Sequence, residues 1–241
     1  MNDRSPDTEF NGHGLADPTF GGLDNVTKGR TRVRIWSRRK VAPRQHIFLQ
    51  GDDKKQVYRV KSGFLRLYVT LDDGRRQIIG FKSTGDFVGL EVGPIHRYSA
   101  QAISAAELYC ISTSEFQAAM TADPEFLLTL FKQVCADLAE ANDQVVTVGR
   151  RQAEESLASF LFAVEARTAE RSFKGDFLSL PMLHSDVADY LGLTSETVSR
   201  VFTHFKKQGL IELRGRHGIR LANRRALKEI AMRPSARHGA S

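Results

Sequence analysis

The segment from residue 184 to residue 203 constrains this chain most, because its apolar spacing fits two short helices joined by a tight turn. Ala188 is a small side chain where the two helices would approach each other, and Gly192 is a turn residue that tolerates positive φ. Thr194 suits the N-cap of the second helix, because its side-chain oxygen accepts a hydrogen bond from a free backbone N–H. The apolar residues that would pack both helices onto a domain are Val187, Leu191, Leu193, Val198 and Val201. The pattern predicts a helix-turn-helix.

A β-hairpin is predicted directly after this motif. Residues 211–221 alternate apolar and polar side chains around a glycine-bearing turn, as a hairpin does. A hairpin after the second helix forms a wing, and it distinguishes this segment from two unrelated apolar helices of similar spacing. The second helix would expose Glu196, Ser199 and Arg200, which can hydrogen-bond base edges, although Ser199 also suits a phosphate contact. Side chains expected to contact DNA phosphates are Thr194, Ser195, Thr197, Lys206 and Arg216.

The positive charge of the chain is concentrated around this motif. The formal net charge is +7, and residues 181–241 hold eleven Lys or Arg against five Asp or Glu. A basic domain of this kind attracts the phosphate backbone of DNA. A second basic run, residues 28–44, has eight Lys or Arg and no acidic residue. We interpret that run as a sheet edge protected by charge against unwanted strand pairing, with direct DNA contact as the alternative.

Length and composition indicate a globular protein of one large or two small domains. The chain has 241 residues, of which 41% are hydrophobic and 26% are charged. It has no run of 18 apolar residues that would cross a membrane, and its N-terminal segment lacks the features of a secretory signal. Its two cysteines, Cys110 and Cys135, are expected in apolar surroundings and have no CxxC spacing, which suits a reducing compartment. We therefore expect a cytoplasmic protein.

The first half of the chain predicts a tail and a β-domain. Residues 1–26 are rich in Gly, Pro, Asp and Asn and are expected to form a disordered or loosely docked tail. Over residues 27–122, short alternating runs separated by turn residues predict an antiparallel β-roll of the jelly-roll type. The candidate strands are residues 33–36, 57–60, 64–69, 77–81, 87–90 and 108–111.

The apolar period becomes helical from Pro124 onward. Three heptads of apolar residues at spacings of four and three form one seam, consisting of Leu127, Phe131, Val134, Leu138, Ala141, Val145 and Val148. The seam predicts a dimerisation helix over residues 123–151 that pairs in parallel with a second copy; the alternative is a helix packed on its own β-domain. After a hinge at residues 150–152, the stripe Leu157, Phe160, Leu161 and Val164 begins a DNA-binding domain of residues 152–232, followed by a tail of residues 233–241. The fold class is α+β.

A β-roll, a long helix and a winged helix in this order resemble the CRP/FNR superfamily of bacterial transcription regulators. The resemblance covers residues 40–230 and is carried by residues 60–67, 85–90, 99–102 and, most closely, 186–200. Residues 89–100 look most like the FixK branch, which controls genes for low-oxygen respiration and nitrogen fixation. The resemblance implies a homodimeric activator that reads a palindrome of TTGAT-like half-sites through Glu196, Ser199 and Arg200, with RNA polymerase as a partner.

The sequence departs from the family's cyclic-nucleotide site. Members that bind cyclic AMP resemble one another in a Gly-Glu-Leu turn and an adjacent Arg-Ser pair, whose Glu holds the ribose and whose Arg holds the phosphate. Here the glutamate, Glu91, lies one place further from Gly89. Tyr98 also separates Arg97 from the following serine. A shift of one residue on a strand turns a side chain to the opposite face, so we expect DNA binding without a cyclic nucleotide.

Other cofactors and an enzymatic role are also not expected. Members that sense oxygen with an iron–sulfur cluster resemble one another in an N-terminal group of cysteines; such a cluster needs four thiolates, and this tail has none. Gating by haem, through His46, His96 or another histidine, or by a nucleotide or other small molecule is the alternative function. A metalloenzyme on a β-roll would need a His-x-His group with a nearby Glu. The sequence has no His-x-His and no catalytic pairing of carboxylates, so we expect neither a metal nor catalysis.

Overall fold

The computed structural model describes residues 26–28, 31–33, 36–150, 152–169, 177–215 and 217–233. The chain divides into two units, residues 1–35 and residues 36–241. In the first unit, strands β1 (Val26–Lys28) and β2 (Thr31–Val33) form an antiparallel hairpin. Most of the expected N-terminal tail and nearly all of the expected C-terminal tail lie outside the described residues.

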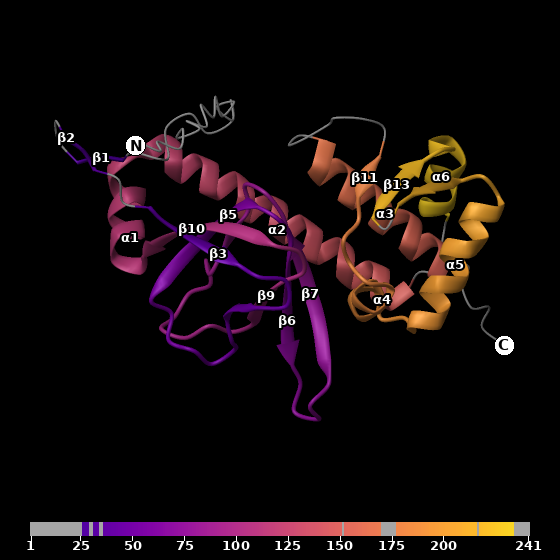
Figure 1. The fold of residues 1–241 in the computed structure, drawn as a ribbon, viewed down its shortest axis with the longest axis horizontal. Coiled ribbons are helices and arrows are strands. Elements are labelled where there is room, and N and C mark those ends of the chain that lie inside the picture. Colours follow the sequence, from indigo (N-terminus) through magenta and orange to yellow (C-terminus); the bar gives the residue numbers. More distant parts are fainter. Residues whose placement is uncertain are drawn as a thin grey trace, which may run out of the picture. The chain divides into compact units, whose positions relative to one another are not determined.

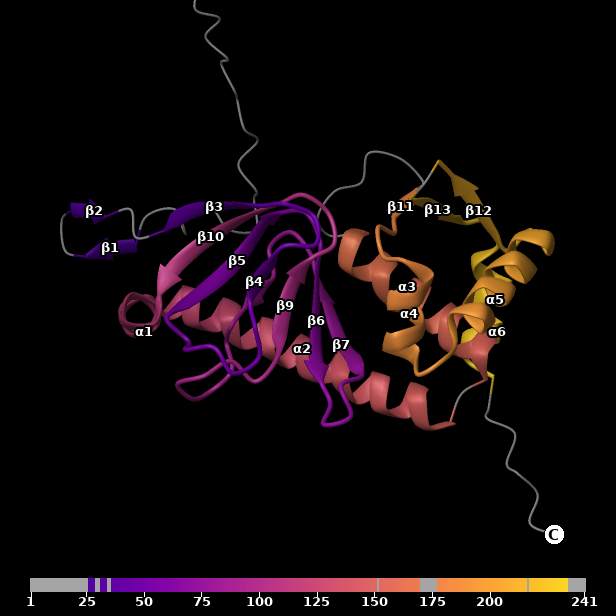
Figure 2. The ribbon, with the colours of Figure 1, turned by 60° about the horizontal axis from the view of Figure 1, so that its bottom comes forward.

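The second unit begins with a β-roll of two four-stranded antiparallel sheets, which Figure 2 shows beside the long helix. One sheet has the order β3-β10-β5-β8 and the other the order β4-β9-β6-β7. The strands are β3 (Ser37–Val41), β4 (His46–Phe48), β5 (Gln56–Ser62), β6 (Leu65–Thr70), β7 (Arg76–Lys82), β8 (Phe87–Val88), β9 (Ser99–Ala102) and β10 (Ala106–Ser112). Alternation along β6 buries Leu65 and Leu67 in the core of the roll and leaves Arg66 and Tyr68 on its outer face. The β-roll prediction is confirmed.

Two of the strand predictions needed correction. Of the expected strand 33–36, Val33 ends β2 and the buried Trp36 lies outside any strand, whereas residues 34 and 35 lie outside the described residues. Residues 87–90 form only the two-residue strand β8. The sequence pattern also missed β3, β4 and β9. In β3 Val41 alone is buried, so the basic residues hide the alternation, and β4 and β9 are too short to establish one. Strand β3 ends its sheet, as the sheet-edge interpretation of the basic run requires for residues 37–41.

Three helices follow the roll in sequence. Helix α1 (Thr113–Ala122), which was not predicted, begins with a capping box in which Ser112 and Glu115 bond each other's backbone N–H. Helix α2 (Pro124–Arg150) buries Phe126 and Leu130 in its first turns. The ring of Phe126 lies 6.0 Å from that of Phe87, which fixes the start of α2 against the roll. Helix α3 (Ala153–Ala169) starts three residues after α2 ends, at the expected hinge.

The C-terminal part is a winged helix. It contains β11 (Leu178–Ser179), α4 (His184–Leu191), α5 (Ser195–Lys207), β12 (Ile211–Arg214), β13 (Gly218–Leu221) and α6 (Arg224–Ala231), drawn in orange and yellow in Figure 1. The three strands form a sheet of order β11-β13-β12, and β12 pairs with β13 as the predicted hairpin. All four residues of the predicted α3 stripe, Leu157, Phe160, Leu161 and Val164, are buried in its core. Elements β11 and α6 were not predicted.

Strand β7 belongs to the core of the winged helix as well as to the roll. Its buried residues Ile78 and Phe81 lie in the same apolar cluster as the side chains of α3 and α4. The ring of Phe81 is 5.3 Å from that of Tyr190 and 6.0 Å from that of Phe160. The winged helix is therefore packed against one strand of the roll. In the described part of the chain, no helix has the length and apolar character needed to cross a membrane.

Candidate nucleic-acid interface

The turn between α4 and α5 is built as the sequence predicts. Gly192 ends α4 in the left-handed region, with φ 68° and ψ 31°. The backbone N–H of Gly192 and that of Leu193 both donate to the carbonyl of Ala188, the latter over 3.0 Å. The Ala188 side chain is buried, so a larger residue there would separate the two helices. The side-chain oxygen of Thr194 then accepts the N–H of Thr197 over 3.1 Å and caps α5.

Helix α5 has one buried face and one exposed polar face. Val198, Val201, Phe202 and Phe205 anchor the buried face. The three predicted base-reading residues, Glu196, Ser199 and Arg200, are all exposed. Ser199 and Arg200 follow Glu196 by three and four residues, which places all three on the same side of the helix. Glu196 and Arg200 have no hydrogen-bond or ion-pair partner among the described residues, so both side chains are available to a ligand.

The residues expected to contact phosphates differ from one another in exposure. Ser195 and Lys206 are exposed at the two ends of α5. Thr197 is half-buried, and its hydroxyl lies 2.8 Å from that of Thr194, so the two side chains bond each other. Arg216 lies outside the described residues.

Thr203 and His184 are two further exposed side chains of the helix-turn-helix. Thr203 is exposed one turn after Ser199, and its hydroxyl donates to the Ser199 carbonyl over 2.9 Å. Helical periodicity alone could have identified it. His184, exposed at the start of α4, stacks on Phe202 with centroids 4.7 Å apart and an interplanar angle of 5°. No local sequence pattern signals that stack.

The wing adds positive charge beside α5. The guanidinium groups of Arg214 and Arg220 lie 5.4 Å and 5.7 Å from the centre of the Phe177 ring. Arg220 is paired with Glu212 on the neighbouring strand, whereas Arg214 is exposed. Arg214 is therefore the cation of the described hairpin that is best placed to meet a phosphate.

The predicted dimer seam of α2 is exposed in the single chain. Leu138 is 61% exposed and Val145 is 73% exposed. The other exposed seam residues are Leu127, Phe131, Val134 and Ala141, whereas the side chain of Val148 lies outside the described part of the chain. Phe126 and Leu130 meet the roll on a different face of α2. The packing of α2 on its own β-domain therefore holds for one face, and the pairing of its exposed seam with a second copy stays a prediction.

The residues that replace the family's nucleotide-binding pattern differ in their surroundings. The carboxylate of Glu91 lies 2.6 Å from Nδ1 of the buried His96, and the His96 ring stacks on Phe48 with centroids 3.6 Å apart. Arg97 is exposed. The hydroxyl of Tyr98 accepts the N–H of Gly89 over 3.1 Å, and burial raises the pKa of Tyr98, which keeps this hydroxyl neutral. The Glu91 carboxylate is thus already engaged by His96, whereas Arg97 faces solvent.

Two cavities are lined by both the roll and α2: one of about 1000 Å³, which α3 also lines, and a smaller one against the sheet of the roll. The smaller cavity, of about 190 Å³, is lined by Leu67, Phe81 and Tyr98 among others. Ligand pockets usually enclose roughly 300–1,000 Å³. Lys82, which lines the smaller cavity, forms an ion pair of 2.6 Å with Asp137 of α2, so its charge is already neutralised.

The other candidate ligand residues are engaged or separated. Nε2 of His46 lies 2.8 Å from the Tyr68 hydroxyl. Within the described residues, no three His, Cys, Asp or Glu side chains come together as a metal site would require. Both cysteines are free; Cys110 is buried, which raises the pKa of its thiol, but Cys135 is exposed. The expectation of apolar surroundings is therefore wrong for Cys135, because it lies on an outward face of α2.

Comparison with known proteins finds a matching family for each of the two domains. Residues 38–123 match the cyclic nucleotide-binding domain family, and residues 155–230 match the Crp-like helix-turn-helix domain family. The chain is 38% identical over 167 residues to the nitrogen fixation regulation protein FixK of Bradyrhizobium diazoefficiens, covering 69% of this chain and 70% of the relative. It is 30% identical over 211 residues to the fumarate and nitrate reduction regulatory protein of Escherichia coli, covering 87% of this chain and 81% of that relative.

A solved structure agrees with these sequence relatives. The structure of FixK2 from Bradyrhizobium japonicum matches with a TM-score of 0.76 and 32% sequence identity, over 83% of this chain and 99% of that one. The order of β-roll, long helix and helix-turn-helix is thus shared over nearly the whole of that protein. The chain belongs to the CRP/FNR superfamily of DNA-binding transcription regulators, in its FixK branch.

Proposed function

We propose that the chain binds a palindrome of TTGAT-like half-sites as a parallel homodimer and activates transcription there together with RNA polymerase. The observation that carries this proposal is the capped helix α5, which exposes Glu196, Ser199 and Arg200 on one face. In this reading Arg200 donates to O6 and N7 of guanine, and Glu196 accepts from the amino group of cytosine. Ser199 serves as a short donor or acceptor.

The dimer follows from the geometry of DNA and from the exposed seam of α2. One winged helix contacts about half of a palindrome, and two-fold dimers place their recognition helices one turn of DNA apart. The exposed apolar seam offers a surface that a second α2 helix would cover. We propose residues 123–151 as the dimerisation helix, between a β-roll of residues 27–122 and a DNA-binding domain of residues 152–232.

The remaining contacts are proposed to set affinity rather than sequence. The proposed phosphate contacts are Thr194, Ser195, Thr197, Lys206 and Arg216. The exposure of Ser195 and Lys206 supports the assignment of these two residues. The names of the relatives, which refer to nitrogen fixation and to fumarate and nitrate reduction, support a role in low-oxygen or nitrogen-metabolism gene control. That role would place the protein in the cytoplasm.

We further propose that DNA binding needs no bound ligand and that the protein is not an enzyme. The engagement of the Glu91 carboxylate by His96 supports independence from cyclic nucleotides. Gating of the same fold by a nucleotide or by haem is the competing function. The two proposals differ in whether the protein requires an added small molecule before it binds DNA.

Binding-site selection with the purified full chain tests the proposal. The protein is incubated with random-sequence DNA in EDTA, with and without cyclic AMP, and the bound sequences are read. We expect a two-fold symmetric motif with TTGAT-like halves in both samples. An absolute requirement for cyclic AMP, or for an iron-bearing coloured fraction of the protein, would support the competing function. Enrichment of single half-sites only would contradict the homodimer.

A further inference from the structure

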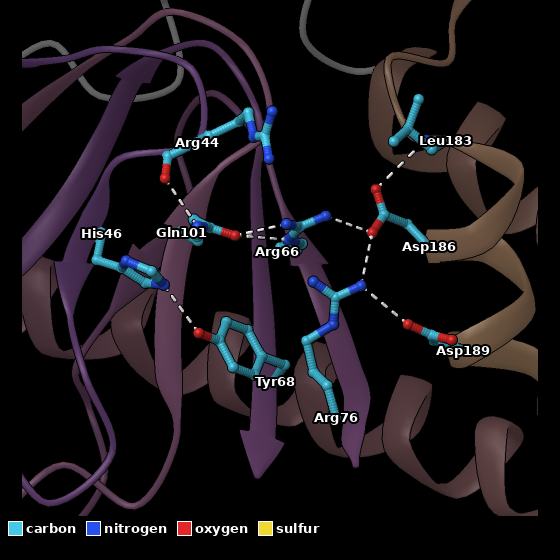
Figure 3. Close-up of polar contacts among 9 residues, drawn as sticks. All are labelled: Arg44, His46, Arg66, Tyr68, Arg76, Gln101, Leu183, Asp186 and Asp189. Atoms are coloured by element: carbon cyan, nitrogen blue, oxygen red, sulfur yellow. Dashed lines mark hydrogen bonds and ion pairs between the residues drawn. The ribbon is translucent and has the colours of Figure 1, made fainter. Parts of the chain in front are cut away.

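A group of charged side chains joins the β-roll to the helix-turn-helix, as Figure 3 shows. Arg66 of β6 forms an ion pair with Asp186 of α4. Arg76, the first residue of β7, bonds both Asp186, over 3.3 Å, and Asp189, over 2.9 Å. We call these four residues, Arg66, Arg76, Asp186 and Asp189, the interdomain latch. None of them was assigned a role by the sequence.

The position of the two arginines follows from strand register. Arg66 lies directly opposite Gln101 of β9, so their side chains share one face of the sheet. The Gln101 side chain accepts from Arg66 and donates to the carbonyl of Arg44, which holds the guanidinium in place. Arg76 lies over the ring of Tyr68, 5.5 Å from its centre. Both guanidinium groups are thus orientated by the roll before they meet α4.

Asp186 is the centre of the latch. Its side chain is 1% exposed and that of Arg66 is 14% exposed, so this pair lies away from water. Its second carboxylate oxygen accepts the backbone N–H of Leu183 over 3.3 Å at the N-terminus of α4. A buried carboxylate is tolerated only where opposite charges and donors surround it, and here the roll supplies both cations.

The other end of α4 is held by the same part of the molecule. Near its C-terminus, the Gln77 side chain of β7 donates to the carbonyl of Asp189. Gln144 of α2 donates to the carbonyl of Tyr190 over 3.1 Å and approaches that of Ile78 at 3.4 Å. Helix carbonyls in the last turn have no partner within the helix, so these amides satisfy them. The first helix of the motif is therefore fixed at both ends, while the reading face of α5 is left exposed.

We propose that Arg66 and Arg76 are positioning residues for DNA binding: through the interdomain latch they fix the helix-turn-helix on the β-roll and so set the half-site spacing that the dimer accepts. The inference rests on the proposed homodimer and its palindrome. Two reading helices fit a duplex only at one separation and one rotation about its axis. A held motif has already lost the orientational freedom that a loose one loses on binding, so it binds one spacing tightly and others poorly.

The test compares Arg76→Ala with the matched control Arg75→Ala. Arg75 lies in the same hairpin, but its side chain is 79% exposed and, among the described residues, forms an ion pair with the nearby Asp73 alone. Arg76 is preferred to Arg66 for substitution, because removal of Arg66 would leave Asp186 buried beside a single, more distant cation. Fluorescence anisotropy with the full-length protein measures affinity for labelled palindromes. Their spacers have the preferred length or differ from it by one base pair, which turns one half-site by about a tenth of a turn.

The interdomain latch predicts a change in spacing discrimination and not only in affinity. The wild type and Arg75→Ala should bind the preferred spacing with equal affinity and discriminate strongly against the others. Arg76→Ala should bind the preferred spacing about five- to tenfold more weakly, and its discrimination should fall by a similar factor. Asp189→Ala should change affinity and discrimination in the same direction. The variant with both substitutions should lose less binding free energy than the sum of the two single losses, because both residues belong to one ion pair.

Two results would overturn the inference. In the first, Arg76→Ala discriminates between spacer lengths as the wild type does. In the second, its affinity falls by the same factor at every spacer length, as a general loss of stability would produce. Thermal unfolding of each variant separates the second result from a protein that has failed to fold. A wild type with no preference for any palindrome would instead contradict the proposed function, so the two failures are distinguishable.

Discussion

The β-roll and the winged helix use polar side chains in opposite ways. In the roll they are already engaged: Glu91 with His96, His46 with Tyr68, and Lys82 with Asp137 of α2. On α5, Glu196 and Arg200 face outward without such partners in the described part of the chain. A polar group that is already paired gains little from a ligand, whereas an exposed and unpaired one can exchange water for a base edge.

This difference assigns the recognition chemistry to the C-terminal domain. In the proposed function, the roll carries the dimerisation helix and holds the helix-turn-helix through the interdomain latch. Its proposed contribution to DNA binding is therefore geometric. The predictions below test that division, beginning with the geometric role that has the largest expected effect.

Leu138→Glu should abolish high-affinity DNA binding. Leu138 is in the middle of the exposed seam, so in a parallel dimer the substitution places two carboxylates face to face in an apolar interface. Sedimentation should show a monomer, and affinity for a palindrome should fall by at least about 100-fold, because the bivalent gain is lost. Lys132→Glu, at an exposed position of α2 outside the seam, is the matched control. A Leu138→Glu dimer that still binds would contradict the role of the seam.

Arg200→Ala should weaken binding at one base pair rather than everywhere. Loss of a bidentate contact to guanine costs about 1–3 kcal/mol at the preferred site and relaxes the preference there. Glu196→Ala should do the same at a different base pair. Binding-site selection with each variant measures the change. If Arg200→Ala lowers affinity uniformly and keeps the wild-type motif, Arg200 contacts the backbone and not a base.

Lys206→Ala should have a smaller and sequence-independent effect. Lys206 is exposed on the last turn of α5, and a phosphate contact there adds affinity without reading bases. The slope of log K against log salt should fall in magnitude by about 1, since one phosphate fewer is neutralised. Titrations at several salt concentrations, on the selected site and on random DNA, give this slope. An unchanged slope would remove Lys206 from the interface.

The sequence predicted best what is determined locally. The small residue Ala188, the positive φ of Gly192 and the cap at Thr194 act within a few residues of one another, so spacing alone identifies the helix-turn-helix. The heptad seam of α2 is likewise a local pattern. Strands β4 and β9 were missed because three or four residues cannot establish an alternation, and because their pairing depends on partners elsewhere in the chain.

The interdomain latch could not be predicted for a related reason. Arg66 and Asp186 are 120 residues apart in sequence, and each occupies a position that local rules explain in another way. Arg66 is at an outward-facing place on a strand, and Asp186 is at the start of a helix, where acidic residues are common. Only the packing of β7 against α4 brings them together. Long-range ion pairs leave no period in the sequence, which is why the contact appears first in the structure.

Arg97→Ala should have the smallest effect, and this result would sharpen the contrast between the two domains. Arg97 is the arginine nearest to the family's phosphate-binding position, yet here its side chain is exposed. Exposed substitutions without partners usually change stability by no more than about 0.5 kcal/mol, so DNA affinity and melting temperature should remain close to those of the wild type. Addition of cyclic AMP should raise the melting temperature of neither protein, since a ligand stabilises only the state that binds it. A nucleotide-dependent rise in the wild type that Arg97→Ala abolishes would instead make the β-roll a ligand sensor.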